Sequence, residues 1–76
     1  MLYNGKYYFM VNVLGRNGYS FMVASNTELN DNQVIELSLD FGLFDYDVDA
    51  EYASIDRLID ERDITHFEDC NCLHNI

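Results

Sequence analysis

Two apolar stretches, KYYFMVNVL at residues 6–14 and YSFMVAS at residues 19–25, decide the fold of this chain. Both are rich in aromatic and β-branched residues and alternate from one residue to the next, which is typical of β-strands. Asn17-Gly18 lies between them, and both residues tolerate the positive φ angles of a type I′ turn. The sequence therefore predicts an antiparallel β-hairpin over residues 3–25. Since both faces of the first strand are apolar, the sequence also allows a homodimer that covers one face of the sheet.

Two short amphipathic helices are expected after the hairpin. Val34, Leu37 and Phe41 recur at helical spacing as far as Gly42 and predict the first helix. The second is predicted from the apolar residues Tyr52, Ile55, Leu58 and Ile59. Asp49 is its expected N-cap, because an aspartate side chain accepts hydrogen bonds from the first free backbone amides of a helix. Its expected outer face carries Asp56, Asp60 and Asp63.

The predicted fold class is α+β, with an N-terminal antiparallel β-hairpin, two short amphipathic helices and a late strand packed as a two-layer domain. The stretch DITHF at residues 63–67 is expected to form the late strand. Residues 1–69 are expected to form this single domain, and residues 70–76 an irregular C-terminal tail. With 76 residues, the chain is near the size at which folding buries only about 60% of the unfolded surface, so we expect its stability to be slight.

The charge of the chain is strongly negative and unevenly placed. Fourteen Asp and Glu residues against four Lys and Arg give a net charge of −10 at pH 7. Residues 1–25 carry only Lys6 and Arg16, whereas residues 26–76 carry every acid. Such a field repels nucleic acid and attracts basic surfaces, so direct DNA or RNA binding is disfavoured. The expected partner is a basic protein that itself binds nucleic acid, although acidic content also has the ordinary explanation of solubility.

The stretch FDYDVDAEY, residues 44–52, has a carboxylate at every second position. If the stretch is extended, its acids point to one side about 6.6 Å apart, because a strand rises about 3.3 Å per residue. A half-buried segment with Phe44, Tyr46 and Val48 facing inward explains this alternation. It does not explain why every solvent-facing position is acidic. We therefore expect one continuous anionic surface for partner binding. Its expected residues are Glu36, Asp40, Asp45, Asp47, Asp49, Glu51, Asp56, Asp60 and Asp63.

Two metal sites are alternatives to this interpretation. Asp45, Asp47, Asp49 and Asp56 occupy positions 1, 3, 5 and 12 of a calcium-loop pattern, but position 6 is Ala50 where the turn requires glycine. His66, Cys70, Cys72 and His74 are zinc-ligating residue types within nine residues. Their Cys-x-Cys spacing is cramped for one metal ion. These four residues give the alternative of a small zinc-stabilised structural or interaction module, and no other cofactor is expected.

The sequence argues against an enzyme, a membrane span and a disulfide scaffold. A catalytic cysteine–histidine pair needs rigid support, which a terminal segment rarely offers, and alternating exposed acids lack the desolvation that acid–base catalysis requires. The chain contains no 18-residue apolar run, and Cys70 and Cys72 are too close together to staple a secreted fold. We expect a cytoplasmic protein.

In its size, its acidity and its DYDVDAE run, the chain resembles small anti-defence proteins of bacteriophages, including anti-CRISPR proteins and DNA-mimic anti-restriction proteins. The resemblance covers the whole chain through its composition and its acidic faces, and not through a motif matched residue by residue. It implies a stoichiometric inhibitor that acts in the host cytoplasm, where its carboxylates occupy a site that a nuclease complex uses for DNA or RNA. An acidic adaptor that docks through the apolar face of its sheet is a third alternative.

Overall fold

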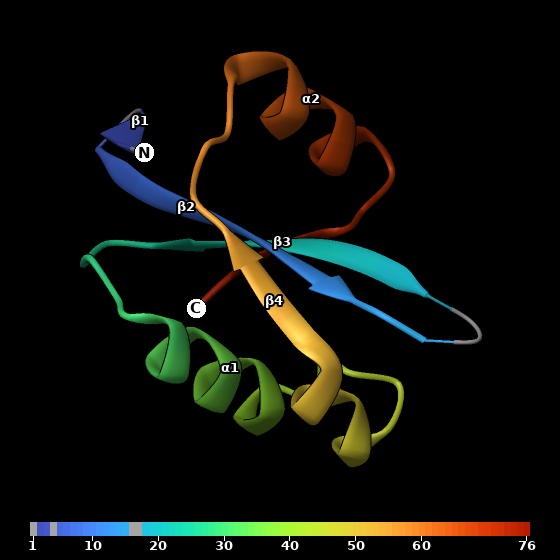
Figure 1. The fold of residues 1–76 in the computed structure, drawn as a ribbon. Coiled ribbons are helices and arrows are strands. Elements are labelled where there is room, and N and C mark those ends of the chain that lie inside the picture. The colour runs from blue at the N-terminus through green and yellow to red at the C-terminus, as the bar shows by residue number, and fades with distance from the viewer. Residues whose placement is uncertain (1, 4, 16–17) are drawn as a thin grey trace.

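A computed structural model describes residues 2–3, 5–15 and 18–76. Within them, a mixed β-sheet separates two layers of helix (Figure 1). The sheet consists of β1 (Leu2–Tyr3), β2 (Lys6–Val13), β3 (Tyr19–Ser25), β4 (Ala53–Asp56) and β5 (Leu73–Asn75).

The hairpin predicted from the sequence is the centre of the sheet. β2 and β3 pair antiparallel from Tyr7 opposite Ser25 to Val13 opposite Tyr19. On its other edge β2 pairs antiparallel with both β1 and β4, and β5 lies parallel to β3. The turn type predicted at Asn17-Gly18 lies outside the described residues, because Arg16 and Asn17 are not among them.

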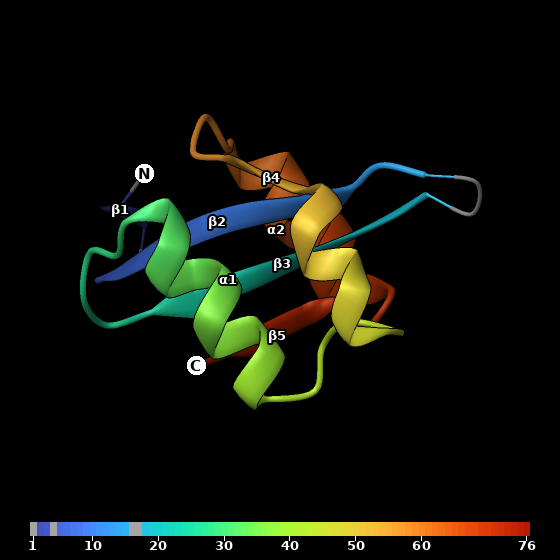
Figure 2. The ribbon, with the colours of Figure 1, turned by 60° about the horizontal axis from the view of Figure 1, so that its bottom comes forward.

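Helices cover both faces of this sheet. The helix α1 (Asp31–Asp40) and the short 3-10 helix η1 (Asp47–Tyr52) lie on one face, and α2 (Glu61–Asp69) lies on the other. Figure 1 shows α2 above the sheet and α1 below it, and Figure 2 shows α1 and the yellow η1 side by side in front of the strands. The molecule therefore has three layers, where the sequence predicted two.

Two buried clusters explain the third layer. The first lies under α1 and η1 and consists of Phe9, Val11, Val13, Phe21, Val23, Val34 and Phe44. The second lies under α2 and consists of Tyr8, Met22, Ala24, Ile59 and Ile64. Successive residues of β2 and β3 point to opposite faces, so a strand that is apolar on both faces supplies both clusters. The second face, which the sequence left to a partner or a second copy, is covered by the chain's own α2.

The first half of the chain matches the prediction, and residues 53–75 do not. The α+β class, the hairpin, two helices and a late strand are confirmed. The second helix, however, begins at Glu61, because the segment over Ala53–Asp56 pairs with β2 as β4. Ile59 is buried while its neighbour Leu58 is 90% exposed, so these residues do not share one helical face.

The predicted late strand and the predicted tail are also placed differently. The stretch 63–67 lies within α2, where Ile64 is buried and Phe67 packs against the same cluster. The late strand is β5, Leu73–Asn75, inside the segment 70–76 for which an irregular tail was expected. Ile76 follows β5, donates its backbone N–H to the carbonyl oxygen of Ala24 at 2.9 Å, and packs against the first cluster.

Local sequence sets both ends of each α-helix. Asn30 and Gln33 form a capping box at the start of α1, and Asp60 and Asp63 form one at the start of α2. In each box the cap side chain accepts from the third backbone amide of the helix, and the third side chain accepts from the amide of the cap residue. The carboxylates of Asp60 and Asp63 thus stabilise the helix terminus that the dipole makes positive.

A residue with positive φ follows the C-terminus of each α-helix. Gly42 has φ 68° after α1, and Asn71 has φ 60° after α2. The amide of Asn71 donates to the carbonyl oxygen of Glu68 at 3.1 Å, and the amide of Cys72 donates to that of Phe67 at 2.8 Å. This is the Schellman pattern of a helix C-terminus. The Cys-Asn-Cys stretch therefore turns the chain from α2 into β5.

Substitution of Asn71 tests this role. Alanine disfavours the left-handed conformation, so we expect Asn71→Ala to lower the free energy of unfolding by about 1 kcal/mol. Asn71→Gly should leave stability unchanged or slightly raise it, because glycine adopts positive φ without strain. Urea unfolding of the two variants and the parent protein measures both effects. Equal stability of the alanine and glycine variants would contradict the assignment.

Candidate acidic interface

One structural layer of the molecule contains acids and no basic residue. Residues 26–52, which include α1, η1 and the loops beside them, lack Lys, Arg and His. Their acids are Glu28, Asp31, Glu36, Asp40, Asp45, Asp47, Asp49 and Glu51. We call residues 26–52 the acidic layer. Because α1 and η1 contact each other over the same sheet face, these charges belong to one side of the fold (Figure 2).

Six of the nine predicted partner-binding residues lie in the acidic layer. Glu36 and Asp40 are exposed on α1, as the helical spacing predicted. Asp45, Asp47 and Glu51 are exposed in and before η1, whereas Asp49 is half-buried.

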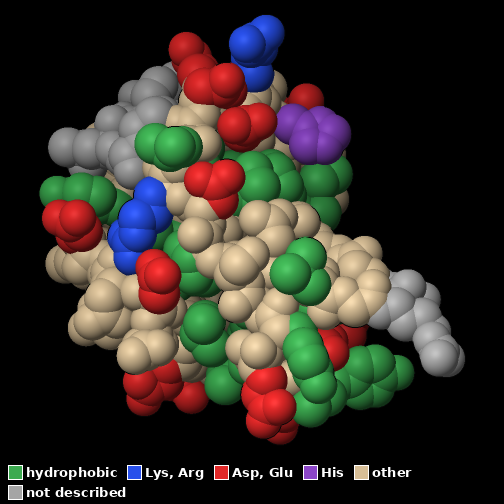
Figure 3. All heavy atoms as spheres, viewed as in Figure 1, with side chains coloured by type: hydrophobic (Ala, Val, Ile, Leu, Met, Phe, Trp, Pro, Cys, Tyr) green, Lys and Arg blue, Asp and Glu red, His purple; other side chains and the backbone are tan. Residues whose placement is uncertain are grey.

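The other three predicted residues lie elsewhere. Asp56 is opposite Met10, a residue that packs on the α2 side of the sheet, and its carboxylate accepts from the backbone amide of Leu58 at 2.9 Å. Asp60 and Asp63 form the capping box of α2. In Figure 3 acidic side chains appear at the top over α2, in the middle and at the left near a basic side chain, and at the bottom over α1 and η1. The predicted surface is therefore divided, and its coherent part is the acidic layer.

The acids of residues 45–51 do not form the predicted ladder of an extended strand. Residues Asp47–Tyr52 form a 3-10 helix, in which alternate side chains do not share a side. Phe44 is buried edge-on against Phe21, with ring centroids 5.4 Å apart. Tyr46 and Val48, which were expected to face inward, are 71% and 56% exposed. Acids and apolar side chains therefore reach solvent together along this segment.

Ion pairs within the chain neutralise little of this charge. Arg57 binds Asp31 at 2.6 Å and lies over the ring of Phe9, 5.0 Å from its centroid. Arg62 approaches Asp60 at 3.9 Å, outside the acidic layer. No described residue forms an ion pair with Glu36, Asp40, Asp45, Asp47, Asp49 or Glu51. Glu28 likewise forms no ion pair with a described residue, so the free protein holds seven like charges on one side, at a cost in stability.

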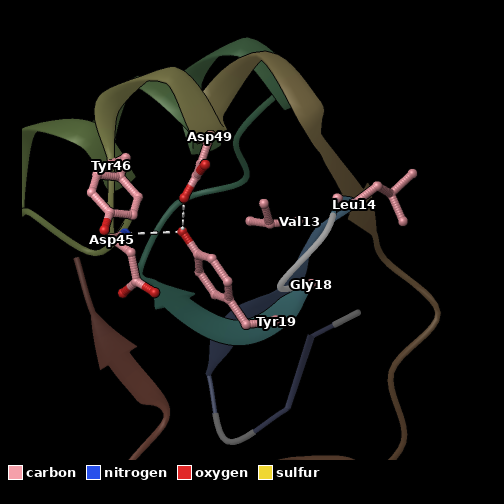
Figure 4. Close-up of a pocket in the computed structure, with 8 residues that line it drawn as sticks. Val13, Leu14, Gly18, Tyr19, Asp45, Tyr46 and Asp49 are labelled. Carbon is pink, nitrogen blue, oxygen red and sulfur yellow. Dashed lines mark hydrogen bonds between the residues drawn. The ribbon is translucent and has the colours of Figure 1, made fainter.

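Tyr19 connects the segment Asp45–Asp49 to the sheet. Its hydroxyl donates to the carboxylate of Asp49 at 2.7 Å and accepts the backbone N–H of Asp45 at 2.9 Å (Figure 4). Burial raises the pKa of the Tyr19 hydroxyl above its ordinary value, and the hydrogen bond to Asp49 raises it further, while the amide of Asp45 acts in the opposite direction. No sequence signal indicated this contact.

The raised pKa of Tyr19 predicts a pH dependence of stability. The folded protein holds the hydroxyl proton more tightly than the unfolded chain, so this contribution is complete below about pH 10 and is lost as pH rises through the folded pKa. At neutral pH, Tyr19→Phe should lower the free energy of unfolding by about 1 kcal/mol. The difference in the free energy of unfolding between parent and variant should narrow as the pH rises above about 10 in urea unfolding, and a constant difference would contradict the role of this hydrogen bond.

A pocket of about 330 Å³ lies beside this contact, between the end of the β2–β3 hairpin and the segment Asp45–Asp49. Val13, Leu14, Gly15 and Gly18 line it on the hairpin side. Tyr19 of β3 also lines the pocket, together with Asp45, Tyr46 and Asp49 from the segment that leads into η1. Figure 4 shows the Tyr19 hydroxyl bonded to both aspartates, with Leu14 beyond Val13 and its side chain directed away from them. Among the described residues, the lining therefore combines two aspartates and two tyrosines with Val13 and Leu14, and includes no basic residue.

Neither predicted metal site has its expected geometry. Positions 1–12 of the calcium pattern, residues 45–56, are divided between a loop, η1 and the paired strand β4 instead of one continuous loop. His66 lies on α2, whereas His74 stacks edge-on against Phe21 on the opposite face of the sheet. In the described part of the chain, no three His, Cys, Asp or Glu side chains are grouped to hold a metal ion.

The two cysteines are free thiols at the end of α2. A hydrogen bond with Cys70 raises the pKa of the Cys72 thiol, and burial and the charge of Cys70 act in the same direction.

Comparison with known proteins places this chain in no family. No family model matches it, and neither a curated protein nor a solved structure is significantly similar. Among the described residues, no helix has the length and apolar composition needed to cross a membrane.

Proposed function

We propose that this protein is a stoichiometric inhibitor that binds a basic, nucleic-acid-binding groove of a host defence protein through its acidic layer. The acidic layer takes the place of a phosphate backbone, and the partner contributes Lys and Arg side chains. The observation that carries this proposal is the segregation of charge: eight acids and no basic residue in residues 26–52, with only Asp31 paired to a described basic residue.

The energetic argument for a partner starts from the cost of this arrangement. A domain of this size has a free energy of unfolding of only about 4–11 kcal/mol, at about 0.05–0.15 kcal/mol per residue. Repulsion among unpaired carboxylates lowers that value, and solubility alone does not require them to be gathered on one side. A basic groove relieves the repulsion, so part of the binding energy is relief of a cost already present in the free protein.

Exposed apolar side chains in the same layer favour a protein partner. Phe41, Tyr46, Val48 and Tyr52 are each more than half exposed among the acids. Tyrosine and phenylalanine are enriched in the centres of protein interfaces, where they contribute contact area that charge alone lacks. Charge repulsion that keeps the protein soluble does not explain why these apolar side chains are exposed.

Affinity capture at two salt concentrations tests the proposal. The immobilised protein is incubated with bacterial lysate at about 50 mM and about 500 mM sodium chloride, and the retained proteins are identified. We expect nucleic-acid-binding proteins to be retained at low salt and largely released at high salt, because exposed charges are screened. Retention of proteins without nucleic-acid-binding activity, or retention insensitive to salt, would contradict the proposal.

A further inference from the structure

We propose that the pocket beside Tyr19 binds the guanidinium group of an arginine side chain, which the partner inserts as an anchor. This inference rests on the proposed function, because it names the chemical group that the acidic layer recognises. It can nevertheless be tested without the partner. The pocket is a concave site with a defined lining, and is distinct from the exposed carboxylates of α1.

The lining of the pocket matches the chemistry of a guanidinium ion. One oxygen of Asp49 accepts from Tyr19, and no described residue donates a hydrogen bond to the carboxylate of Asp45. Carboxylate oxygens are thus available at a pocket that the apolar residues Val13 and Leu14 also line. An arginine presents five N–H donors at the end of an apolar stem, so its head can donate to the acids while its stem contacts the apolar lining.

Aromatic rings distinguish this site from a simple acidic surface. The rings of Tyr19 and Tyr46 border the pocket, and a planar guanidinium stacks on such rings while its edges donate to carboxylates. A hydrated metal ion requires several oxygen ligands and gains nothing from an apolar wall. An ammonium group is more strongly hydrated than a guanidinium group and lacks its planar fork. We therefore expect arginine to bind more tightly than lysine.

The position of Tyr19 makes the site ready before binding. Its hydroxyl connects β3 to both ends of the Asp45–Asp49 segment, so the Asp49 carboxylate and the backbone at Asp45 are held at the pocket by the sheet. Tyr46 precedes η1 and carries no packing role in the core, since most of its side chain is exposed. A cation that covers the Tyr46 ring therefore buries apolar surface that is exposed to solvent in the free protein.

Titration with N-acetyl-arginine amide, followed by two-dimensional NMR of the whole protein, tests the site. We expect shifts confined to the residues that line the pocket, weak binding in about the millimolar range, and weaker binding of N-acetyl-lysine amide at equal ionic strength. Asp45→Asn should weaken arginine binding about fivefold, and Tyr46→Ala about threefold. Each substitution alters an exposed side chain, and the Asp45 backbone amide that binds Tyr19 is retained.

Matched control variants distinguish binding in the pocket from general attraction by the negative charge of the acidic layer. Asp47→Asn removes the same charge, and Tyr52→Ala the same ring, from exposed positions outside the pocket, so each should change the affinity less than about twofold. Equal losses from Asp45→Asn and Asp47→Asn, or shifts spread over the whole acidic layer, would overturn the pocket while leaving the inhibitor proposal standing. Arginine binding with no salt-sensitive capture of nucleic-acid-binding proteins would support the pocket and overturn that proposal.

Discussion

Replacement of Ile59 by alanine is expected to lower the free energy of unfolding by about 2–5 kcal/mol, because the lost methylene groups leave a cavity under α2. Ile59 is buried with Tyr8, Met22 and Ile64 on the face of the sheet opposite α1. A loss of this size is a large part of the total stability of a 76-residue domain, so much of the variant should be unfolded near physiological temperature.

The neighbouring residue provides the control. Leu58 is 90% exposed, so Leu58→Ala should change the free energy of unfolding by no more than about 0.5 kcal/mol. Urea denaturation followed by circular dichroism compares the two variants with the parent. If Ile59→Ala were as harmless as Leu58→Ala, α2 would not cover the second face of the sheet, and the three-layer arrangement would be wrong.

Neutralising three acids of the acidic layer should slow association with the basic partner by about tenfold at low salt, because electrostatic steering depends on the local field. The variant is Asp45→Asn, Asp47→Asn and Glu51→Gln, all at exposed positions. Asp49 is kept, because its carboxylate holds Tyr19. Stopped-flow or surface-based kinetics with the captured partner measures the effect. The variant should fold with equal or slightly higher stability, since repulsion is relieved.

A second triple variant carries the same change of net charge on the other side of the sheet. Glu61→Gln, Glu68→Gln and Asp69→Asn alter α2 and should change the association rate less than about threefold. Raising salt to about 500 mM should reduce the difference between the two variants to less than about twofold. Equal slowing by both variants at low salt would mean that net charge alone, and not the acidic layer, drives association.

The parts of the fold that sequence predicted are those in which local pattern and tertiary packing agree. Alternation in residues 6–14 and 19–25 gave the hairpin, and the spacing up to Gly42 gave α1. β4 and β5 are short, and each is held by pairing with a distant strand, which residue pattern alone does not reveal. The start of α2 did carry a signal, since Asp60 and Asp63 have capping-box spacing before Ile64. The competing helical spacing of residues 52–59 concealed it.

The candidate site was predictable in its charge and not in its shape. Exposure of Glu36, Asp40 and Asp45 follows from their spacing beside apolar residues. The conformation of residues 45–49 depends on Tyr19, which is distant in sequence and binds both Asp45 and Asp49. Such a contact has no local signature. The same is true of the pocket, because its lining residues come from the hairpin and from residues 45–49, which are distant from it in sequence.

Competition with nucleic acid tests most directly whether the acidic layer occupies a nucleic-acid groove. The captured partner is loaded with a labelled duplex that it binds, and the inhibitor is titrated in at constant ionic strength. The account predicts that one equivalent of protein releases the duplex, that excess duplex releases the protein, and that the triple variant of the acidic layer is less effective than the α2 triple variant. A stable ternary complex of partner, duplex and inhibitor would contradict it.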